Sequence, residues 1–185
     1  MYRTAAFWDR IAEKYANAPI RNQESYQYTL DRTRHYLHVE DRVLEIGCGT
    51  GSTALELAPL VSEIVATDIS SAMLTKGRAK VKEAEIDNIT FAHADAQHAP
   101  NGPFEVVTAF NLLHLVEDLD GTLAAIAART KPGGLFISKT FCVPGGLSWI
   151  TPLIYVALPV MQAIGKAPYF VRLNARDLDA AIISA

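Results

Sequence analysis

Three glycines at alternate positions follow a short apolar run, and no other part of this chain has a clearer chemical meaning. The segment contains Glu45-Ile46-Gly47-Cys48-Gly49-Thr50-Gly51-Ser52-Thr53 and comes directly after Val43-Leu44. This pattern predicts a buried strand, a glycine turn and a helix that Ser52 or Thr53 can begin. Because glycine has no Cβ, the backbone can approach a nucleotide-like ligand closely. We therefore expect a ligand-binding loop.

The glycine spacing and one carboxylate indicate whether the loop binds a dinucleotide or a nucleoside that carries a cation. A dinucleotide loop requires G-x-G-x-x-G, whereas Gly51 comes one position early and Ser52 stands where the third glycine belongs. Glu45, just before Gly47, would repel a pyrophosphate and attract a cation. An amino acid nucleoside that carries a sulfonium group meets this requirement.

Four further segments follow the glycine loop along the chain, and together with the loop they form an ordered set of motifs. With Val43 to Gly51 they resemble the motifs of class I S-adenosylmethionine-dependent methyltransferases, over roughly residues 40 to 141. The matching segments are Val65-Ala66-Thr67-Asp68-Ile69-Ser70, Ala94-Asp95-Ala96, Phe104 to Leu115 and Lys131-Pro132-Gly133-Gly134-Leu135. The resemblance implies S-adenosylmethionine as the cofactor and S-adenosylhomocysteine as the product.

Asp68 is expected to bind the ribose of this cofactor. It ends a predicted strand about twenty residues beyond Gly47, the distance at which a carboxylate accepts hydrogen bonds from ribose hydroxyls. A competing interpretation makes Asp68 the N-cap of the helix that begins near Ser71. Ile69 would flank the adenine and Met73 would cover its other face, although both residues also suit an ordinary core.

The remaining cofactor contacts are assigned by the resemblance. It places Asp95 and the Ala96 backbone at the adenine, although Asp95 also suits a plain surface loop. The other expected contacts are Glu45 and Gly47 at the ammonium group, with Cys48, Gly49 and Gly51 in the same loop, Asn111 and Leu112 opposite them, and Tyr15 over the methionine end. Asn111 also suits a turn, and Tyr15 also suits a helix core.

Methyl transfer from a sulfonium is an in-line displacement, so positioning and exclusion of water supply most of the catalysis. If the acceptor must lose a proton, His114 is the best candidate for the base, with local packing as the alternative role. The exit of the strand at 104–110 lacks the Asn/Asp-Pro-Pro-Tyr/Phe motif of base-modifying relatives, so we expect no nucleic-acid substrate. We also expect no metal site.

Composition limits the partners and the location. The chain has 185 residues, 50% of them hydrophobic, with a net charge of −3. This composition suits one compact domain without a broad cationic surface. Cys48 and Cys142 show no disulfide or metal spacing, and charged residues near the N-terminus exclude a signal peptide there. We expect a cytoplasmic protein that binds a small-molecule acceptor.

The apolar periodicity predicts an α/β fold. Two N-terminal helices separated at Pro19 precede strands near 42–46, 63–68, 89–94, 104–110 and 135–141, with helices near 52–61, 71–85 and 119–130. This order predicts a Rossmann-like parallel sheet with helices on both faces. We expect residues 1–40 to form a helical cap, 41–141 the cofactor-binding core and 142–185 an apolar substrate or cap region, all within one domain.

The segment 147–164 carries no charge over about the length of a membrane span. Pro152 and Pro159 argue against a spanning helix, which leaves a pocket-covering helix pair, a dimer contact or a peripheral membrane contact. The antiparallel hairpin that usually ends the family's sheet is not apparent. We expect methyl transfer to a small, apolar or lipid-like acceptor, with a cofactor-binding module without turnover as the alternative and a homodimer as a further expectation.

Overall fold

A five-stranded parallel sheet forms the centre of the protein. The computed structural model describes residues 2–142 and 158–185, with side chains from residue 4 onward. The strands run in the order β3-β2-β1-β4-β5, so β2 and β3 lie on one side of β1 and β4 and β5 lie on the other. Their bounds are Arg42–Ile46 for β1, Glu63–Asp68 for β2, Ile89–His93 for β3, Phe104–Phe110 for β4 and Thr130–Lys139 for β5.

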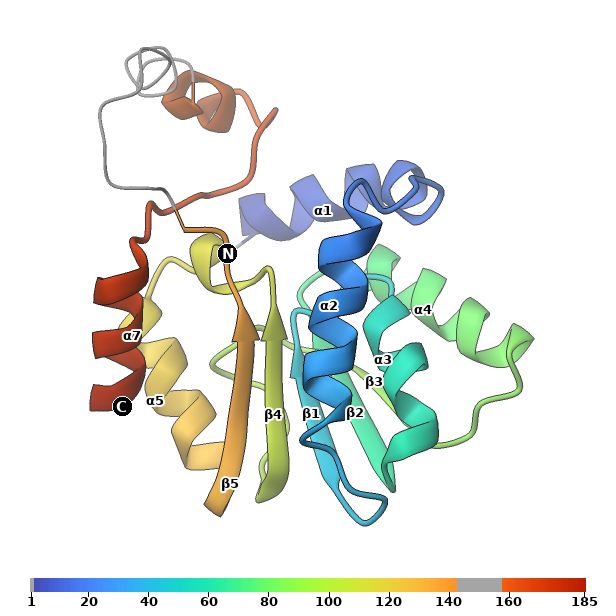
Figure 1. The fold of residues 1–185 in the computed structure, drawn as a ribbon. Coiled ribbons are helices and arrows are strands. Elements are labelled where there is room, and N and C mark those ends of the chain that lie inside the picture. Colours follow the sequence, from blue (N-terminus) through green and yellow to red (C-terminus); the bar gives the residue numbers. More distant parts are fainter. Residues whose placement is uncertain (1, 143–157) are drawn as a thin grey trace.

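Helices cover both faces of this sheet (Figure 1). The helices α2, α3 and α4 lie on one side, α5 and α7 lie on the other, and α1 crosses above the carboxyl ends of the strands (Figure 1). Their bounds are Tyr2–Ala16 for α1, Gln23–Arg34 for α2, Ser52–Leu57 for α3, Ser71–Glu83 for α4, Leu119–Arg129 for α5 and Ala175–Ser184 for α7. Two short 3₁₀ helices, η1 (Ala58–Leu60) and η2 (Leu113–Leu115), and a helical stretch at 158–163 complete the set described here.

The three central strands, β2, β1 and β4, are largely apolar because they are buried on both faces. In β1, Val43 belongs to a cluster that contains Leu30 of α2 and Leu74 of α4. Leu44, the next residue, belongs to a second cluster with Leu123 of α5 and Leu178 of α7. Consecutive side chains of a strand point to opposite faces, so one strand anchors two helix layers.

The predicted Rossmann-like α/β fold is confirmed, and several element boundaries differ from the sequence-based expectation. The helix expected near 52–61 is α3 followed by η1, because Pro59 has no N–H to continue the α-helical ladder. The helix expected near 71–85 ends at Glu83. The fifth strand begins at Thr130, whose pairing with Phe104 shifts in register before Val106 pairs with Leu135, so the glycine turn lies inside the strand.

The far edge of the sheet and the C-terminal region were the least defined by sequence. Within the described residues β5 pairs only with β4, and no antiparallel strand follows it. Most of the charge-free segment 147–164 lies outside the described residues, which resume at 158. No helix in the described part of the chain is both long and apolar enough to cross a membrane. The division into cap, core and C-terminal region stays a prediction.

Candidate active site

A cavity of about 990 Å³ lies at the carboxyl ends of the strands, beneath α1. Its walls come from α1, the loop before α2, the glycine loop, the ends of β2 and β4, and the loop after β3. This is the switch point of the sheet, where the connections from neighbouring strands leave in opposite directions and leave a crevice. All the sequence-predicted cofactor residues except Gly51 line it.

The three glycines of the loop have different structural roles. Gly47 and Gly51 adopt φ values of +70° and +68°, and a Cβ would lie 2.7 Å from Leu112 Cδ1 and 2.8 Å from Phe91 Cζ, respectively. Only Tyr15, at 3.9 Å, would come near a Cβ of Gly49. Gly51 is therefore required for turn geometry and packing, whereas Gly49 is the glycine that opens the backbone toward the cavity.

Glu45 is an unpaired carboxyl group at the base of the cavity. It is only 3% exposed, and its Oε2 has no hydrogen-bond partner among the described residues. Burial, with a further contribution from the charge of Asp68, raises the pKa of Glu45 to about 8. An unpartnered buried carboxyl is costly, so this group is suited to a ligand that brings a cation or hydrogen-bond donors.

Asp68 connects the end of β2 to the glycine loop. Gly49 N–H donates to its Oδ2 and Ser70 N–H donates to its Oδ1, both at 2.8 Å. Burial raises the pKa of Asp68, although these two hydrogen bonds oppose the rise. The alternative role as N-cap of α4 is wrong, because Ser70 is the N-cap and its hydroxyl accepts from Met73 N–H. Each carboxylate oxygen of Asp68 keeps a lone pair for a ligand hydroxyl.

Asp95 is more fully engaged by its own loop. Its Oδ1 accepts from the N–H groups of Gln97 and His98, both at 2.9 Å, and the His98 ring contacts both oxygens. The Arg129 guanidinium donates to the carbonyl oxygens of Gln97 and Ala99 and so holds this loop against the body of the protein. Asp95 and Ala96 line the cavity, but the Asp95 carboxylate is largely satisfied without a ligand.

Asn111 and Leu112, which follow β4, line the cavity, whereas His114 packs against two phenylalanines. Asn111 has a φ of +55°, and its N–H donates to Lys139 O at 2.6 Å, so it is both a turn residue and a cavity residue. The His114 ring packs edge-on against Phe141 and Phe170, with its Nδ1 buried and unpartnered among the described residues. Burial lowers the His114 pKa, and the residue is not part of the cavity wall.

Helix α1 closes the top of the cavity. Its Asp9 accepts hydrogen bonds from Ser70 Oγ at 2.7 Å and from Ala72 N–H at 3.1 Å, and its Glu13 pairs with Lys76 of α4. These contacts fix the side of α1 that faces α4. Tyr15 lines the cavity next to Trp8, and their rings meet edge to face at 6.3 Å.

Several cavity residues gave no signal in the sequence. Lys80 of α4 reaches the end of the glycine loop, where its ammonium group donates to the hydroxyls of Thr50 and Ser52. Lys80 lies far along the chain from the glycine loop, so only the packing of α4 against β3 and the loop brings the three residues together. Gln97 and Asp118, hydrogen-bonded to each other at 2.7 Å, line the opposite part of the cavity.

Comparison with known proteins agrees with this architecture. The family profile described as a methyltransferase domain matches residues 43–134, from β1 to the glycines of β5. The ubiquinone/menaquinone biosynthesis C-methyltransferase UbiE of Teredinibacter turnerae is 38% identical over 110 residues, which is 56% of this chain and 44% of that protein. This chain belongs to the class I S-adenosylmethionine-dependent methyltransferase family.

A second relative and two solved structures extend the comparison. The demethylmenaquinone methyltransferase of Clavibacter sepedonicus is 36% identical over 148 residues, 77% of this chain and 59% of that protein. The chain thus spans about half the length of these curated relatives. The YcgJ protein of Bacillus subtilis superposes with a TM-score of 0.71 at 22% identity, over 85% of this chain and 67% of that one. Phosphoethanolamine N-methyltransferase 2 of Haemonchus contortus, in complex with S-adenosyl-L-methionine, gives 0.70 at 20% identity, over 86% and 36%.

The family's cofactor is S-adenosylmethionine, and the observed donors and acceptors fit it. Glu45 supplies a buried acceptor without a partner, the side of Gly49 that would carry a Cβ is open, and Asp68 retains free lone pairs at the end of β2. Glu45 matches the ammonium group of the cofactor, the open side of Gly49 leaves room for the cofactor to lie close to the loop, and Asp68 matches the ribose hydroxyls.

Proposed function

We propose that this protein transfers a methyl group from S-adenosylmethionine to a small, largely apolar acceptor. In this proposal Glu45 holds the ammonium group, Asp68 accepts from the ribose hydroxyls, and Asp95 with the Ala96 backbone lies at the adenine. Gly47, Cys48 and Gly49 form the floor, while Ile69, Met73, Asn111, Leu112 and Tyr15 enclose the rest. Gly51 contributes through the turn geometry of the loop.

The observation that carries this proposal is the unpartnered Glu45 carboxyl. A buried group with a pKa of about 8 and a free oxygen would be a liability in a protein with no cationic ligand. An ammonium group placed beside it favours the ionised carboxylate and supplies the missing donors. The same group would repel the pyrophosphate of a nicotinamide dinucleotide, which disfavours an oxidoreductase.

The cavity wall contains apolar residues beyond those assigned to the cofactor. Trp8, Ile11, Ile20, Leu115 and Val116 all contribute to its wall. Such a wall suits an apolar ring or chain. The two curated relatives are named as a ubiquinone/menaquinone C-methyltransferase and a demethylmenaquinone methyltransferase, which supports a quinone-type ring as the first acceptor to test.

When bound, the cofactor supplies an activated methyl group, and the protein positions the two reactants and excludes water. Helix α1 lies over the cavity, and Leu112 and Met73 line its walls, so these residues would shield a bound cofactor from water. Correct placement of this kind can lower a barrier by about 7–11 kcal/mol. A base at His114 is not supported by its placement between Phe141 and Phe170, and a base of any kind is optional in this reaction.

Calorimetry with S-adenosylmethionine and S-adenosylhomocysteine tests the cofactor assignment. We expect both to bind in the micromolar range, and Asp68→Ala to weaken both at least tenfold, as the loss of charge-assisted hydrogen bonds requires. Asp87→Ala, an exposed aspartate outside the cavity wall, is the matched control and should bind normally. Absence of binding to the unmodified protein would refute the proposal.

Turnover is tested separately, because a binding module without turnover would pass the calorimetric test. S-adenosylhomocysteine release is measured with demethylmenaquinone and with a panel of phenols and amines. Release that depends on one acceptor supports the enzyme.

Cytoplasmic location, a homodimer and peripheral membrane contact stay predictions from the sequence.

A further inference from the structure

Lys80 lies in the cavity wall and has no anionic partner among residues 2–142 and 158–185. Its Nζ donates to Thr50 Oγ1 at 2.9 Å and to Ser52 Oγ at 2.8 Å, and both of these groups are neutral. It takes part in none of the ion pairs found among the described residues. Burial lowers the pKa of Lys80, so its charge is held at some cost in free energy. A bound anion would offset that cost.

The hydrogen-bond inventory at this point leaves donors free to contact an anion. An ammonium group has three hydrogens, and Lys80 uses two of them on the hydroxyl oxygens. Thr50 Oγ1 and Ser52 Oγ are also hydrogen-bonded to each other at 3.4 Å, so one of the two hydroxyls uses its hydrogen in that bond and the other keeps its hydrogen for a further acceptor. The third ammonium hydrogen of Lys80 and that hydroxyl hydrogen are the two donors left for an oxyanion.

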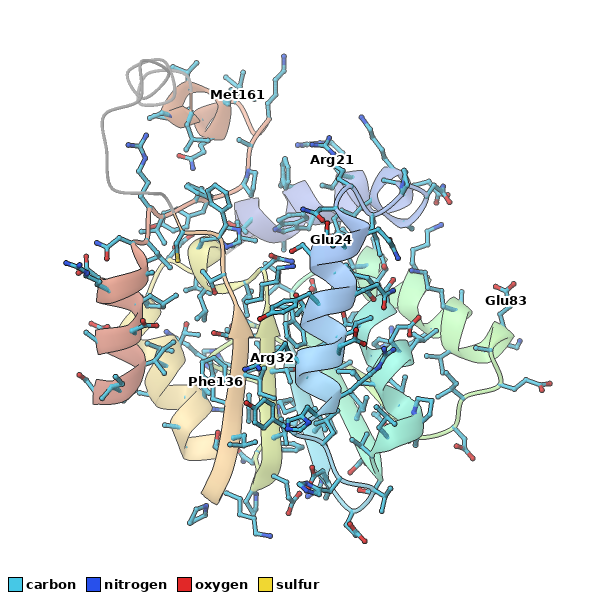
Figure 2. All side chains as sticks on the ribbon, viewed as in Figure 1. Arg21, Glu24, Arg32, Glu83, Phe136 and Met161 are labelled. Atoms are coloured by element: carbon cyan, nitrogen blue, oxygen red, sulfur yellow. The ribbon has the colours of Figure 1, made fainter. Side chains whose placement is uncertain are left out.

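The raised pKa values of the two buried acids of the cavity have causes other than Lys80. Burial and the charge of Asp68 raise the pKa of Glu45, and burial with Asp9 raises that of Asp68, while Lys80 contributes to neither shift. Lys14 and Arg21 line the cavity with Lys80. Arg21 stands at the upper end of α2, beside the end of α1 (Figure 2). The cavity therefore has an acidic side along β1 and β2 and a cationic side toward α4 and the loop before α2.

We propose that Lys80, Thr50 and Ser52 form a subsite for an oxyanion, a carboxylate or a phosphate, carried by the acceptor molecule. The inference rests on the proposed function and narrows its substrate class from an apolar molecule to one with an apolar body and an acidic group. The acidic side of the cavity is matched to the cofactor's cation, and the cationic side is free for a group of opposite charge.

Inorganic phosphate is the probe for this subsite. Protein saturated with S-adenosylhomocysteine is titrated with phosphate, and the Lys80 ammonium signal is followed by NMR of selectively labelled lysine. We expect a saturable shift of that signal and a higher Lys80 pKa when phosphate is bound. No saturable response in the unmodified protein would overturn the proposal.

Matched variants distinguish phosphate binding at Lys80 from non-specific attraction of phosphate to positive charge. The measurement for each variant is the rise in Tm on addition of phosphate. Lys80→Gln should abolish the stabilisation by phosphate, Lys80→Arg should retain part of it, and Lys82→Gln, an exposed lysine on the same helix, should retain all of it. Equal stabilisation of Lys80→Gln and the unmodified protein would overturn the proposal. If Lys80→Gln does not fold, Ser52→Ala takes its place and should weaken phosphate binding severalfold, and unchanged binding would count against the subsite.

A second ligand pair identifies the source of the anion. S-adenosylhomocysteine carries its own carboxylate, whereas 5′-methylthioadenosine lacks the amino acid end. We expect Lys80→Gln to bind both within about twofold of the unmodified protein, since a factor of two is only about 0.4 kcal/mol. A tenfold loss confined to S-adenosylhomocysteine would assign Lys80 to the cofactor and overturn the acceptor assignment. If S-adenosylhomocysteine does not bind at all, the proposed function fails, and phosphate titration of the unliganded protein still decides on the subsite.

Discussion

Two regions of the cavity carry acidic residues that follow strands, and they differ in how far the protein satisfies them. At the ends of β1 and β2, Glu45 has one oxygen without a partner in the part of the chain that the structure describes, and Asp68 accepts a single backbone hydrogen bond on each oxygen. In the loop after β3, Asp95 accepts two backbone hydrogen bonds on one oxygen and further contacts from the His98 ring. The first region is incomplete without a ligand and the second is nearly complete.

This difference indicates that the acids of the first region bind the ligand, whereas the acid of the second region organises its loop. A carboxylate with unused lone pairs gains much from a ligand that donates to it, whereas a satisfied carboxylate gains little. We therefore expect most of the cofactor affinity to come from Glu45 and Asp68. Asp95 is expected to act mainly by shaping the loop that Arg129 holds in place.

Replacement of Glu45 should have the largest effect. Glu45→Gln keeps the size of the side chain and removes its charge, so the ammonium group loses a charge-assisted partner worth about 1.5–3 kcal/mol. We expect the Kd for S-adenosylhomocysteine to rise roughly tenfold to a hundredfold by calorimetry. Binding of 5′-methylthioadenosine, which has no ammonium group, is the control and should not change. Equal losses for both ligands would remove Glu45 from this role.

The second-largest effect is expected from pH, which should change the affinity for the cofactor through the ionisation of Glu45. The pKa of Glu45 is about 8 in the unliganded protein, and an ammonium ligand favours the ionised form. Binding must then release a proton below pH 8, so affinity should rise by up to about tenfold per pH unit between pH 6 and 8. Calorimetry in buffers of different ionisation enthalpy measures the released proton. The Glu45→Gln variant should lose this release, and an unchanged release would contradict the assignment.

The same group predicts how the stability of the unliganded protein changes with pH. The folded-state pKa of Glu45 is raised above its ordinary value of 4.5, so the unfolded chain ionises first as the pH rises. This group's contribution to stability is complete below pH 4.5 and is lost as the pH rises through 8. The Tm of the unmodified protein should therefore fall relative to that of Glu45→Gln over this range. Parallel Tm curves would show that Glu45 ionises as readily when folded.

Changes at Asp95 should weaken cofactor binding less than changes at Asp68. Asp95→Asn preserves an acceptor oxygen for the loop N–H groups, and we expect a loss of only a few fold in calorimetry. Asp68→Asn, the matched substitution at the end of β2, should weaken binding by at least tenfold. A larger loss at Asp95 than at Asp68 would reverse the comparison between the two regions.

The smallest effect on turnover is expected at His114. Its ring is packed between Phe141 and Phe170, so His114→Ala should lower the Tm while kcat stays within about twofold. A general base would instead contribute about a hundredfold to ten-thousandfold. A loss of that size, with unchanged cofactor affinity, would restore His114 as the base.

The local pattern was sufficient to predict the strands, the glycine loop and the acids at the strand ends. Continuous apolar runs and glycine spacing are properties of neighbouring residues, so β1, β2 and β4 were predicted with their observed bounds. The start of β5 was wrong because strand pairing with β4, rather than the Lys131 to Gly134 turn signal, decides where that strand begins. The role of Gly51 also depended on a distant residue, Phe91.

The sequence by itself determined the order of the elements and the position of the acids along the chain, because both follow from periodicity and from residues next to one another. Tertiary structure alone decided which groups are satisfied. It gave Asp95 most of its donors, left one oxygen of Glu45 without a partner among the described residues, packed His114 against Phe141 and Phe170, and placed Lys80 against Thr50 and Ser52. Burial and hydrogen bonding depend on residues far apart in the chain, and only packing brings those residues within reach.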